Sequence, residues 1–237
     1  VKAGHSVAIA EQTEDPAAAK KRGSKAIVNR AVVRVITPGT LTEERLLEGR
    51  RANWLLSVFP GAEEAGLAWA DISTGELWLG AVPERALADE IARIAPAEIL
   101  SPEGSGRGTE LPKGAFDSAG AERALVARLG VATLEGFGSF PRVALAAAGG
   151  LLRHVEATAR GSAVLLKPPR LYGVDAVMAI DRATRASLEL TEGASSLLRA
   201  IDLTVTAAGG RLLAGELAAP LTELEAIEAR LDLVQWI

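Results

Sequence analysis

The chain contains no cysteine among its 237 residues. This excludes disulfide bonds, thiolate metal ligands and a cysteine nucleophile. Histidine is scarce as well, with only His5 and His154, so neither a histidine-rich zinc site nor a pair of catalytic histidines is expected. The pattern G-x-x-x-x-G-K-[ST] is missing, and the sequence therefore predicts no phosphate-binding P-loop.

Long hydrophobic runs are missing too. The longest stretch without a charged residue covers 52–62, eleven residues, whereas a membrane-spanning helix needs about 20 apolar residues. No basic segment followed by an apolar one opens the chain, so no secretory signal is recognised. We therefore expect a cytoplasmic protein with no membrane partner. The start on Val1 and the end on Trp236 and Ile237 are what we expect of a piece of a longer chain.

Positive charge is in short supply, since 26 Lys and Arg face 30 Asp and Glu, a net charge of −4. Residues 1–40 nevertheless carry seven basic and three acidic side chains, a balance of +4, whereas 41–175 and 176–237 each stand at −4. Any contact with DNA phosphates is therefore expected in the first 40 residues. Arg30 and Arg34 alternate with apolar residues on a predicted strand, which puts both on one face. They are either DNA contacts or the solvated face of that strand.

Local patterns divide the chain into the same three parts. Residues 1–40 are read as a partial α/β domain with a strand at 6–10, a helix at 17–22 and a strand at 31–36. Residues 41–175 are read as a compact α/β domain with a mixed sheet. Its predicted elements are a helical connecting segment at 41–58, a hairpin of strands at 66–71 and 76–80, a helix at 83–95, a strand at 98–100, a loop at 101–114, and helices at 121–129 and 142–160. Residues 176–237 are read as all-α, with helices at 183–190, 195–201, 206–217 and 222–237.

Asp71 is the one side chain that suggests catalysis. It ends a predicted strand and precedes the turn Ile72–Gly75. Ribonuclease-H-like nucleases hold a divalent metal between carboxylates on neighbouring elements, but this chemistry needs more than one carboxylate, and no partner stands at a recognisable spacing. An aspartate at a strand end ordinarily caps the turn with its own side chain. Capping is the favoured interpretation, and a nuclease or hydrolase using Asp71 remains the alternative.

Three other features have ordinary structural interpretations. The glycine-rich run 104–108 opens no helix, so a flexible loop is predicted. His154 has no second ligand four residues later, and a surface or half-buried histidine is expected. The four tryptophans lie on different predicted elements, which favours core or interface packing over a platform for stacking bases.

Several groups of residues resemble, in order along the chain, the bacterial MutS family of DNA mismatch repair proteins. Residues 7–12, 15–16 and 32–40 look like the end of the family's mismatch-recognition domain. Residues 71–76 and 96–100 are similar to its connector domain. The third group looks like the opening of its helical core, or lever: 181–191, 203–206 and 226–230.

The sequence also departs from the family pattern. It contains no Phe-x-Glu, the family's mismatch-reading motif, and no Walker-type ATPase segment. Gly210, beside Gly209, replaces the family's usual serine, and each glycine is expected to loosen the helix predicted there by about 1 kcal/mol relative to alanine.

The resemblance implies a ribonuclease-H-like connector between the other two parts. It implies a structural relay with no catalytic residue, metal site or cofactor of its own. The whole protein would be a homodimer that binds double-stranded mismatched DNA, uses ATP and magnesium, and presents a surface to a MutL-like protein. The competing function is a metal-dependent ribonuclease-H-like nuclease or hydrolase that uses Asp71.

Overall fold

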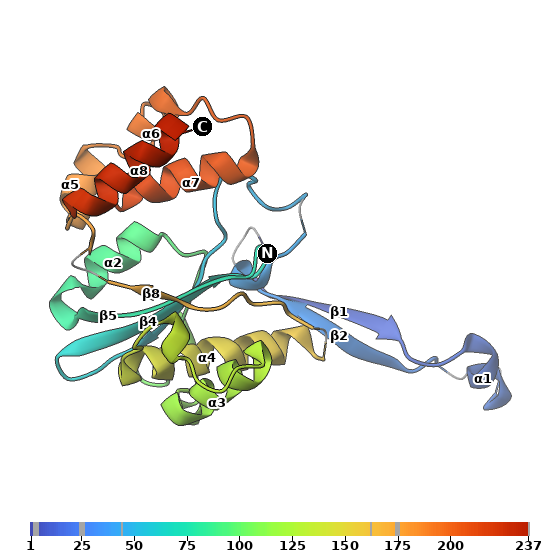
Figure 1. The fold of residues 1–237 in the computed structure, drawn as a ribbon. Helices are drawn as coiled ribbons and strands as arrows, with labels where there is room; N and C mark the ends of the chain where they lie inside the picture. The colour runs from blue at the N-terminus through green and yellow to red at the C-terminus, as the bar shows by residue number, and fades with distance from the viewer. Residues whose placement is uncertain (2–4, 24–26, 44, 162, 174–175, 237) are drawn as a thin grey trace.

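The computed structural model describes residues 1, 5–23, 27–43, 45–161, 163–173 and 176–236. Figure 1 shows a two-stranded ribbon that protrudes from the body, a central sheet with helices on both faces, and a group of helices beside the sheet. Lys2 and Lys25, two of the seven basic residues of the first part, lie outside the described residues. So do Asp175 and Ile237, at the ends of the predicted second and third parts.

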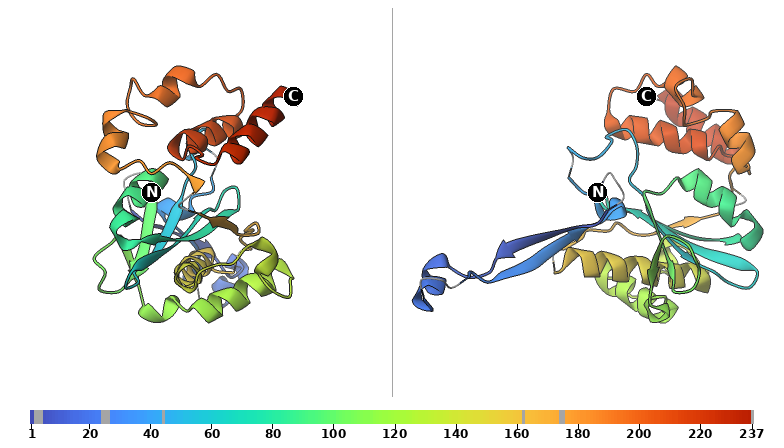
Figure 2. Two further views of the ribbon diagram at one scale, coloured as in Figure 1. Left: turned by 60° about the vertical axis from the view of Figure 1, so that its left-hand side comes forward. Right: turned by 180° about the vertical axis from the view of Figure 1, so that it is seen from behind.

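The ribbon confirms the predicted order of strand, helix and strand. β1 (Val7–Gln12) pairs antiparallel with β2 (Arg30–Ile36), and α1 (Pro16–Lys21) lies at the far end of the ribbon (Figure 2). The Asp15 carboxylate accepts the Ala17 amide at 2.9 Å, which satisfies one of the free N–H groups at the helix start. Every residue of β1 is exposed, whereas β2 becomes buried toward Ile36, where it approaches α4.

The prediction of a helical segment at 41–58 is wrong. The 3₁₀ turn η1 (Pro38–Thr40) precedes this segment, the segment itself contains turns at 45–47 and 49–51, and it ends in β3 (Leu55–Phe59). Leu55, Leu56 and Val58 are fully buried, since β3 lies in the sheet interior with both faces covered. A short apolar run of this kind has no alternation that would separate a buried strand from a buried helix.

The central sheet has six strands in the order β7-β6-β3-β4-β5-β8. β4 (Glu64–Asp71) and β5 (Glu76–Pro83) continue β3 as an antiparallel meander. β6 (Glu98–Pro102) runs parallel to β3, β7 (Thr109–Leu111) parallel to β6, and β8 (Arg170–Tyr172) parallel to β5. The predicted hairpin and mixed sheet are confirmed, and a meander extended by parallel strands agrees with a ribonuclease-H-like connector.

Besides β3, two further strands of this sheet were not predicted. β7 lies within the predicted loop 101–114, and β8 follows Pro168 and Pro169. Each is an edge strand of three residues, too short to show a periodic pattern. A proline that precedes an edge strand removes no hydrogen bond between strands. This explains why β8 can directly follow two prolines.

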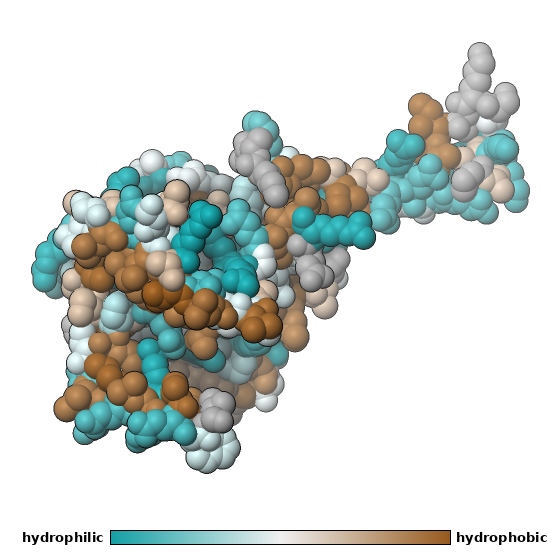
Figure 3. All heavy atoms as spheres, turned by 90° about the horizontal axis from the view of Figure 1, so that it is seen from above, coloured by the Kyte–Doolittle hydropathy of each residue, from teal (hydrophilic) through white to brown (hydrophobic). Residues whose placement is uncertain are grey.

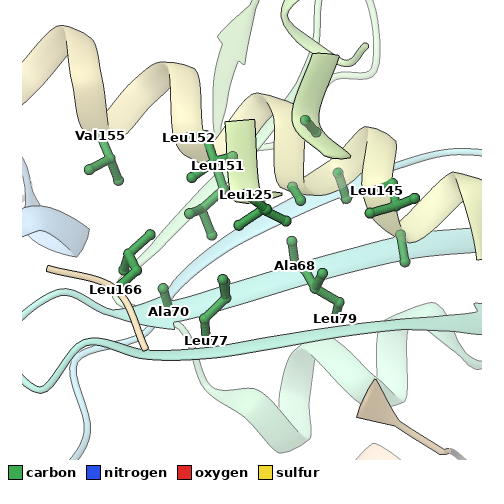
Figure 4. Packing of buried hydrophobic residues seen from close by; sticks show 14 of the residues in the cluster. Ala68, Ala70, Leu77, Leu79, Leu125, Leu145, Leu151, Leu152, Val155 and Leu166 are labelled. Carbon is green, nitrogen blue, oxygen red and sulfur yellow. The ribbon is translucent and has the colours of Figure 1, made fainter. Parts of the chain in front are cut away.

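Helices cover both faces of the sheet. α2 (Leu87–Ile94), preceded by η2 (Glu84–Ala86), packs on one face with Leu56, Leu67 and Trp69. α3 (Ser118–Leu129) and α4 (Arg142–Ala159) pack on the other. Figure 4 shows the second core, in which sheet side chains such as Leu77 and Leu79 point toward Leu145 and Leu151 of α4. The short 3₁₀ turns η3 (Lys113–Ala115) and η4 (Glu135–Phe137) flank α3.

Glycines remove side chains where α4 packs on its neighbours. A Cβ atom on Gly66 of β4 would lie 1.9 Å from the carbonyl oxygen of Val143. On the helix itself, a Cβ on Gly150 would lie 2.5 Å from the ring of Phe116. Direct backbone contact between β4 and α4 therefore fixes the helix on the sheet.

The third part is helical, as predicted, with α5 (Arg182–Ser187), α6 (Leu197–Ile201), α7 (Ala207–Ala218) and α8 (Leu224–Trp236). We call it the helical segment. Many of its apolar side chains are exposed, among them Leu203, Val205 and Trp236, and Figure 3, which looks down on this part, shows them gathered in bands. Among the described residues, no helix combines the length and apolar character needed to span a membrane.

Candidate functional site

Asp71, the candidate catalytic carboxylate, ends β4 with only 2% of its surface exposed. One carboxylate oxygen accepts the Ser73 amide at 2.9 Å and the Ser73 hydroxyl at 2.5 Å. The other accepts the Asn53 amide at 3.0 Å. Among the described residues no three His, Asp or Glu side chains come together as a metal site. Asp71 is therefore a turn cap that also holds the neighbouring backbone, and nothing supports the nuclease or hydrolase alternative.

The contact between Asn53 and Asp71 belongs to a larger one, in which the linker after β2 meets the sheet. We call it the ribbon joint, and it consists of Thr37, Pro38, Gly39, Asn53, Asp71, Glu98 and His154. The Gly39 amide donates to the Glu98 carboxylate at 2.9 Å, and the Asn53 side-chain amide donates to the Pro38 carbonyl at 2.9 Å. Two linker amides, those of Gly39 and Asn53, thus donate to two carboxylates of the connector, and this fixes the direction in which the ribbon leaves the sheet.

Gly39 fits a space that admits no side chain. A Cβ at this position would lie 2.6 Å from Cδ1 of Leu55 and 2.9 Å from Cβ of Glu98. The turn is also closed internally, since the Thr37 amide donates to the Thr40 hydroxyl at 2.9 Å. The Thr-Pro-Gly-Thr turn is therefore docked against the connector.

His154 completes the ribbon joint from α4, and the expectation of a surface or half-buried histidine is wrong. The residue is only 7% exposed, with its Nε2 atom 3.5 Å from a Glu98 oxygen and 3.4 Å from the Thr37 hydroxyl. Burial lowers the pKa of His154, and the Glu98 charge opposes this effect. His154 lies three residues after Leu151 and four before Thr158, both of which are buried. This helical spacing could have predicted that position 154 faces inward.

A second contact, the helix joint, connects the other face of the sheet to the helical segment. It consists of Trp69, Asp89, Glu90, Arg93, Tyr172, Arg182 and Arg185. Glu90 and Arg93 of α2 form an ion pair at 2.7 Å in which each side chain is nearly buried, and the Tyr172 hydroxyl donates to Glu90 at 2.9 Å. The Arg93 guanidinium lies over the rings of Tyr172, at 4.6 Å, and Trp69, at 5.7 Å. Burial raises the pKa of the Tyr172 hydroxyl, so it stays a donor.

The helical segment enters this joint through α5. The Arg182 amide donates to the Asp89 carboxylate at 2.9 Å, and Arg185, itself 9% exposed, donates to the Ala218 carbonyl at 2.9 Å. Burial, with a contribution from the nearby Arg93 charge, lowers the pKa of Arg185. Nη2 of Arg93 and Nε of Arg185 have no hydrogen-bond partner within the part of the chain that the structure describes. The helix joint therefore brings together more cationic donors than acceptors.

Trp54, Trp69 and Trp78 follow the predicted role in packing, whereas Trp236 is exposed. Trp69 and Trp78 stack with ring centres 6.1 Å apart, and Arg170 of β8 lies 5.3 Å from the centre of the Trp78 ring. Trp69 also meets Tyr172 edge-on at 5.2 Å. These aromatic rings form the floor of the helix joint.

The structure does not bring Arg30 and Arg34 together. β2 pairs Arg30 with Gln12 and Arg34 with Ile9, and the register shifts between Ile9 and Ala10. Gln12 and Ile9 are three residues apart on β1, so their partners lie on opposite faces of the ribbon. Arg30 is exposed. The Arg34 guanidinium donates to the Glu43 carboxylate at 2.9 Å and the Thr42 hydroxyl at 2.7 Å, which commits it to the linker.

The glycine-rich run 104–108 is a loop, as predicted, and it holds a carboxylate of its own. The amides of Gly104 and Gly106 donate to Glu110 at 3.2 and 2.8 Å. These backbone hydrogen bonds lower the pKa of Glu110. The loop thus folds around its own anion.

The connector thus lies between two packed joints, with a ribbon on one side and a helical segment on the other. Comparison with known families identifies the family to which the chain belongs. The family model for MutS domain I matches residues 1–45, that for MutS domain II matches 53–168, and that for MutS domain III matches 183–237. The chain belongs to the MutS family.

Curated relatives agree with this assignment. The DNA mismatch repair protein MutS of Cereibacter sphaeroides is 48% identical over 251 residues, covering 100% of this chain and 29% of the relative. That of Paracoccus denitrificans is 49% identical over 245 residues, covering 97% and 28%. That of Roseobacter denitrificans is 44% identical over 247 residues, covering 97% and 28%. The chain thus spans less than a third of the length of these relatives.

Proposed function

We propose that this chain is the relay part of a DNA mismatch repair protein. It links the recognition of mismatched double-stranded DNA, on the side of the ribbon, to an ATPase reached through the helical segment, and it presents a surface to a MutL-like protein. The proposal divides the chain into parts at 1–40, 41–175 and 176–237. It assigns the chain no catalytic residue, no metal site and no cofactor.

The observation that carries this proposal is the pair of joints. The connector is held by specific hydrogen bonds at both ends, from the Gly39 amide to Glu98 on one side and from the Arg182 amide to Asp89 on the other. A displacement of the ribbon can pass through such contacts because each fixes a direction as well as a distance. The names of the relatives supply the process, DNA mismatch repair.

In the whole protein, the proposal places ATP and magnesium in a domain outside this chain. It also takes the whole protein to be a homodimer that acts in the cytoplasm. Neither the P-loop pattern nor the Phe-x-Glu pattern occurs in the sequence, so nucleotide binding and mismatch reading are both assigned to other parts of the whole protein.

The relay is tested by loosening each joint in the full-length protein that carries this sequence. Gly39→Ala loosens the ribbon joint, Glu90→Gln loosens the helix joint, and Gly114→Ala is a control, because a Cβ on Gly114 meets nothing within 4 Å. We expect both joint variants to keep DNA affinity and basal ATP turnover but to lose most of the stimulation of turnover by a G·T mismatch. Unchanged stimulation in both variants would contradict the relay.

DNA binding by this chain alone is expected to be weak and blind to mismatches. The basic side chains of the ribbon supply phosphate contacts, which carry no sequence information. Fluorescence anisotropy on matched and G·T duplexes should give dissociation constants of about 10⁻⁴–10⁻⁶ M, the range of non-specific binding. Arg30→Ala should lower the salt slope by about 0.9, whereas Arg34→Ala should change it less, since Arg34 is paired with Glu43. A clear preference for the mismatch would show that the chain itself reads bases.

A further inference from the structure

The linker between ribbon and connector also touches the helical segment directly. In Figures 1 and 2 the chain after η1 leaves the sheet, reaches α7 and returns to enter β3. The turn at residues 48–51 forms this contact, and its partners lie more than 140 residues later in the chain. This contact belongs to neither the ribbon joint nor the helix joint.

Arg50 makes the strongest of these contacts. Its guanidinium donates through Nη1 to the Asp202 carboxylate at 2.7 Å and through Nη2 to the Thr204 carbonyl at 2.8 Å. Asp202 is held in place, since its other oxygen accepts the Thr204 amide at 3.0 Å and the Thr204 hydroxyl at 2.5 Å. A guanidinium that meets two fixed acceptors defines an orientation, which a lysine in its place would not.

A reciprocal contact runs in the other direction. Arg211 of α7 donates to the Gly49 carbonyl of the linker. The helix also makes room for Arg50, because a Cβ on Gly210 would lie 3.1 Å from Cγ of Arg50 and 3.3 Å from its Cβ. The glycine pair that the sequence predicted to loosen this helix therefore has a positive role, as Gly210 admits the linker. Arg51 pairs with Glu192 at 3.0 Å, but both side chains are more than half exposed, so this pair contributes little.

We propose that Arg50 and Arg211 are positioning residues that clamp the linker to the helical segment, so that the ribbon is coupled to these helices by a path that bypasses the sheet. The clamp consists of Gly49, Arg50, Asp202, Thr204, Gly210 and Arg211. Its mechanical role stands on these contacts, and its role in signalling rests on the proposed function. In that role the clamp and the helix joint act in parallel.

The test uses the natural absence of cysteine in the chain, which allows spin labels at chosen sites only. Ala17→Cys on α1, Ala127→Cys on α3 and Ala229→Cys on α8 are exposed positions in three different parts. Pulsed dipolar spectroscopy then gives the distance distribution between α1 and α8, and separately between α1 and α3. We expect Arg50→Ala to broaden the α1–α8 distribution at least twofold and to leave the α1–α3 distribution unchanged. Arg123→Ala, at an exposed arginine of α3, is the matched control and should change neither.

Two further arms keep the result decisive. Arg50→Lys, which retains the charge and the fold, should give an intermediate width because one of the two acceptors is lost. High salt should broaden the α1–α8 distribution of the unaltered chain, since Arg50 is half exposed, but not that of Arg50→Ala. If both Arg50 variants keep the α1–α8 distribution width of the unaltered chain, the clamp is overturned. Broadening without loss of mismatch-stimulated ATP turnover in the full-length protein would leave the clamp standing and contradict the proposed relay instead.

Discussion

The ribbon joint and the helix joint hold the connector by different means. In the ribbon joint, backbone amides of Gly39 and Asn53 donate to carboxylates that have further donors around them. In the helix joint, Arg93 pairs with the buried carboxylate of Glu90 and Arg185 donates to the Ala218 carbonyl, and each arginine keeps one N–H group without a partner among the residues the structure describes. Unmade hydrogen bonds of buried charged groups reduce stability.

This difference indicates which joint can open at lower cost. The carboxylates of the ribbon joint accept hydrogen bonds from backbone amides, and Gly39 is tightly packed, so we expect this joint to move as one body with the connector. The helix joint keeps an excess of positive charge at the contact with α5, and the helical segment beyond it has an exposed apolar surface that includes Leu203 and Val205. We therefore expect the connector and ribbon to rotate together relative to the helices when the clamp of Arg50 and Arg211 also opens.

The largest effect is expected from removing the charge that balances the helix joint. Glu90→Gln leaves Arg93 buried without its carboxylate partner, which should lower the free energy of unfolding by about 3–5 kcal/mol. Urea denaturation followed by tryptophan fluorescence measures this loss. Glu156→Gln is the control, because Glu156 is half exposed and 3.8 Å from Arg128, and it should change stability by less than about 0.5 kcal/mol. Equal effects of the two variants would mean that the helix joint is not a buried ion pair.

At the ribbon joint, we expect stability to depend on the size of the side chain at position 39 and not on charge. Gly39→Ala places a methyl group within 3 Å of Leu55 and Glu98, and overpacking of this kind costs about 1–3 kcal/mol. Gly114→Ala, at an open position without a positive φ, should be neutral or stabilise the protein by up to about 1 kcal/mol. Thermal unfolding of both variants checks the pair. A Gly39→Ala protein as stable as Gly114→Ala would show that the turn is not docked.

A smaller loss of stability is expected when the aromatic ring at position 172 is kept and only its hydrogen bond to Glu90 is removed. Tyr172→Phe removes the donor to Glu90 while the contacts of the ring with Trp69 and Arg93 remain. The expected cost is about 0.5–1.5 kcal/mol, measured by urea denaturation. A double-mutant cycle with Glu90→Gln should show that the two losses are not additive, since both act on one carboxylate.

The smallest effect concerns pH and sharpens the comparison at the ribbon joint. Because burial lowers the pKa of His154 in the folded protein, the unfolded chain binds the proton more readily below about pH 6.5. The contribution of neutral His154 to stability is therefore complete above that pH and is lost as the pH falls toward the lower pKa of the folded state. Urea midpoints measured between pH 7.5 and 5.5 should fall for the unaltered chain and stay flatter for His154→Gln. Parallel pH profiles would mean that His154 is not buried against Glu98.

The sequence predicts those elements whose pattern is local. The hairpin of β4 and β5 was recognisable from apolar runs on either side of the Asp71 turn, and α4 from its apolar face. β3 was not, because a strand buried on both faces has no alternating pattern, and β7 and β8 are too short.

The joints were beyond the reach of local patterns for a different reason. Gly39 meets Glu98 across 59 residues, and Tyr172 meets Glu90 across 82. Neither pair is marked by its neighbours in the sequence. The sequence placed Arg34 on the same face as Arg30. A β-bulge, which no residue type in β2 predicts, puts the two side chains on opposite faces of the ribbon.

Hydrogen exchange at the linker amides tests most directly whether the ribbon is docked on the connector. The amides of Gly39 and Asn53 donate to Glu98 and Asp71, and we predict that both exchange as slowly as amides of β3, at rates set by opening of the connector core. Amides of α1, at the far end of the ribbon, should exchange much faster. Exchange of Gly39 and Asn53 at the rate of α1 would contradict the account, because a linker that opens independently of the sheet leaves the ribbon free of the connector.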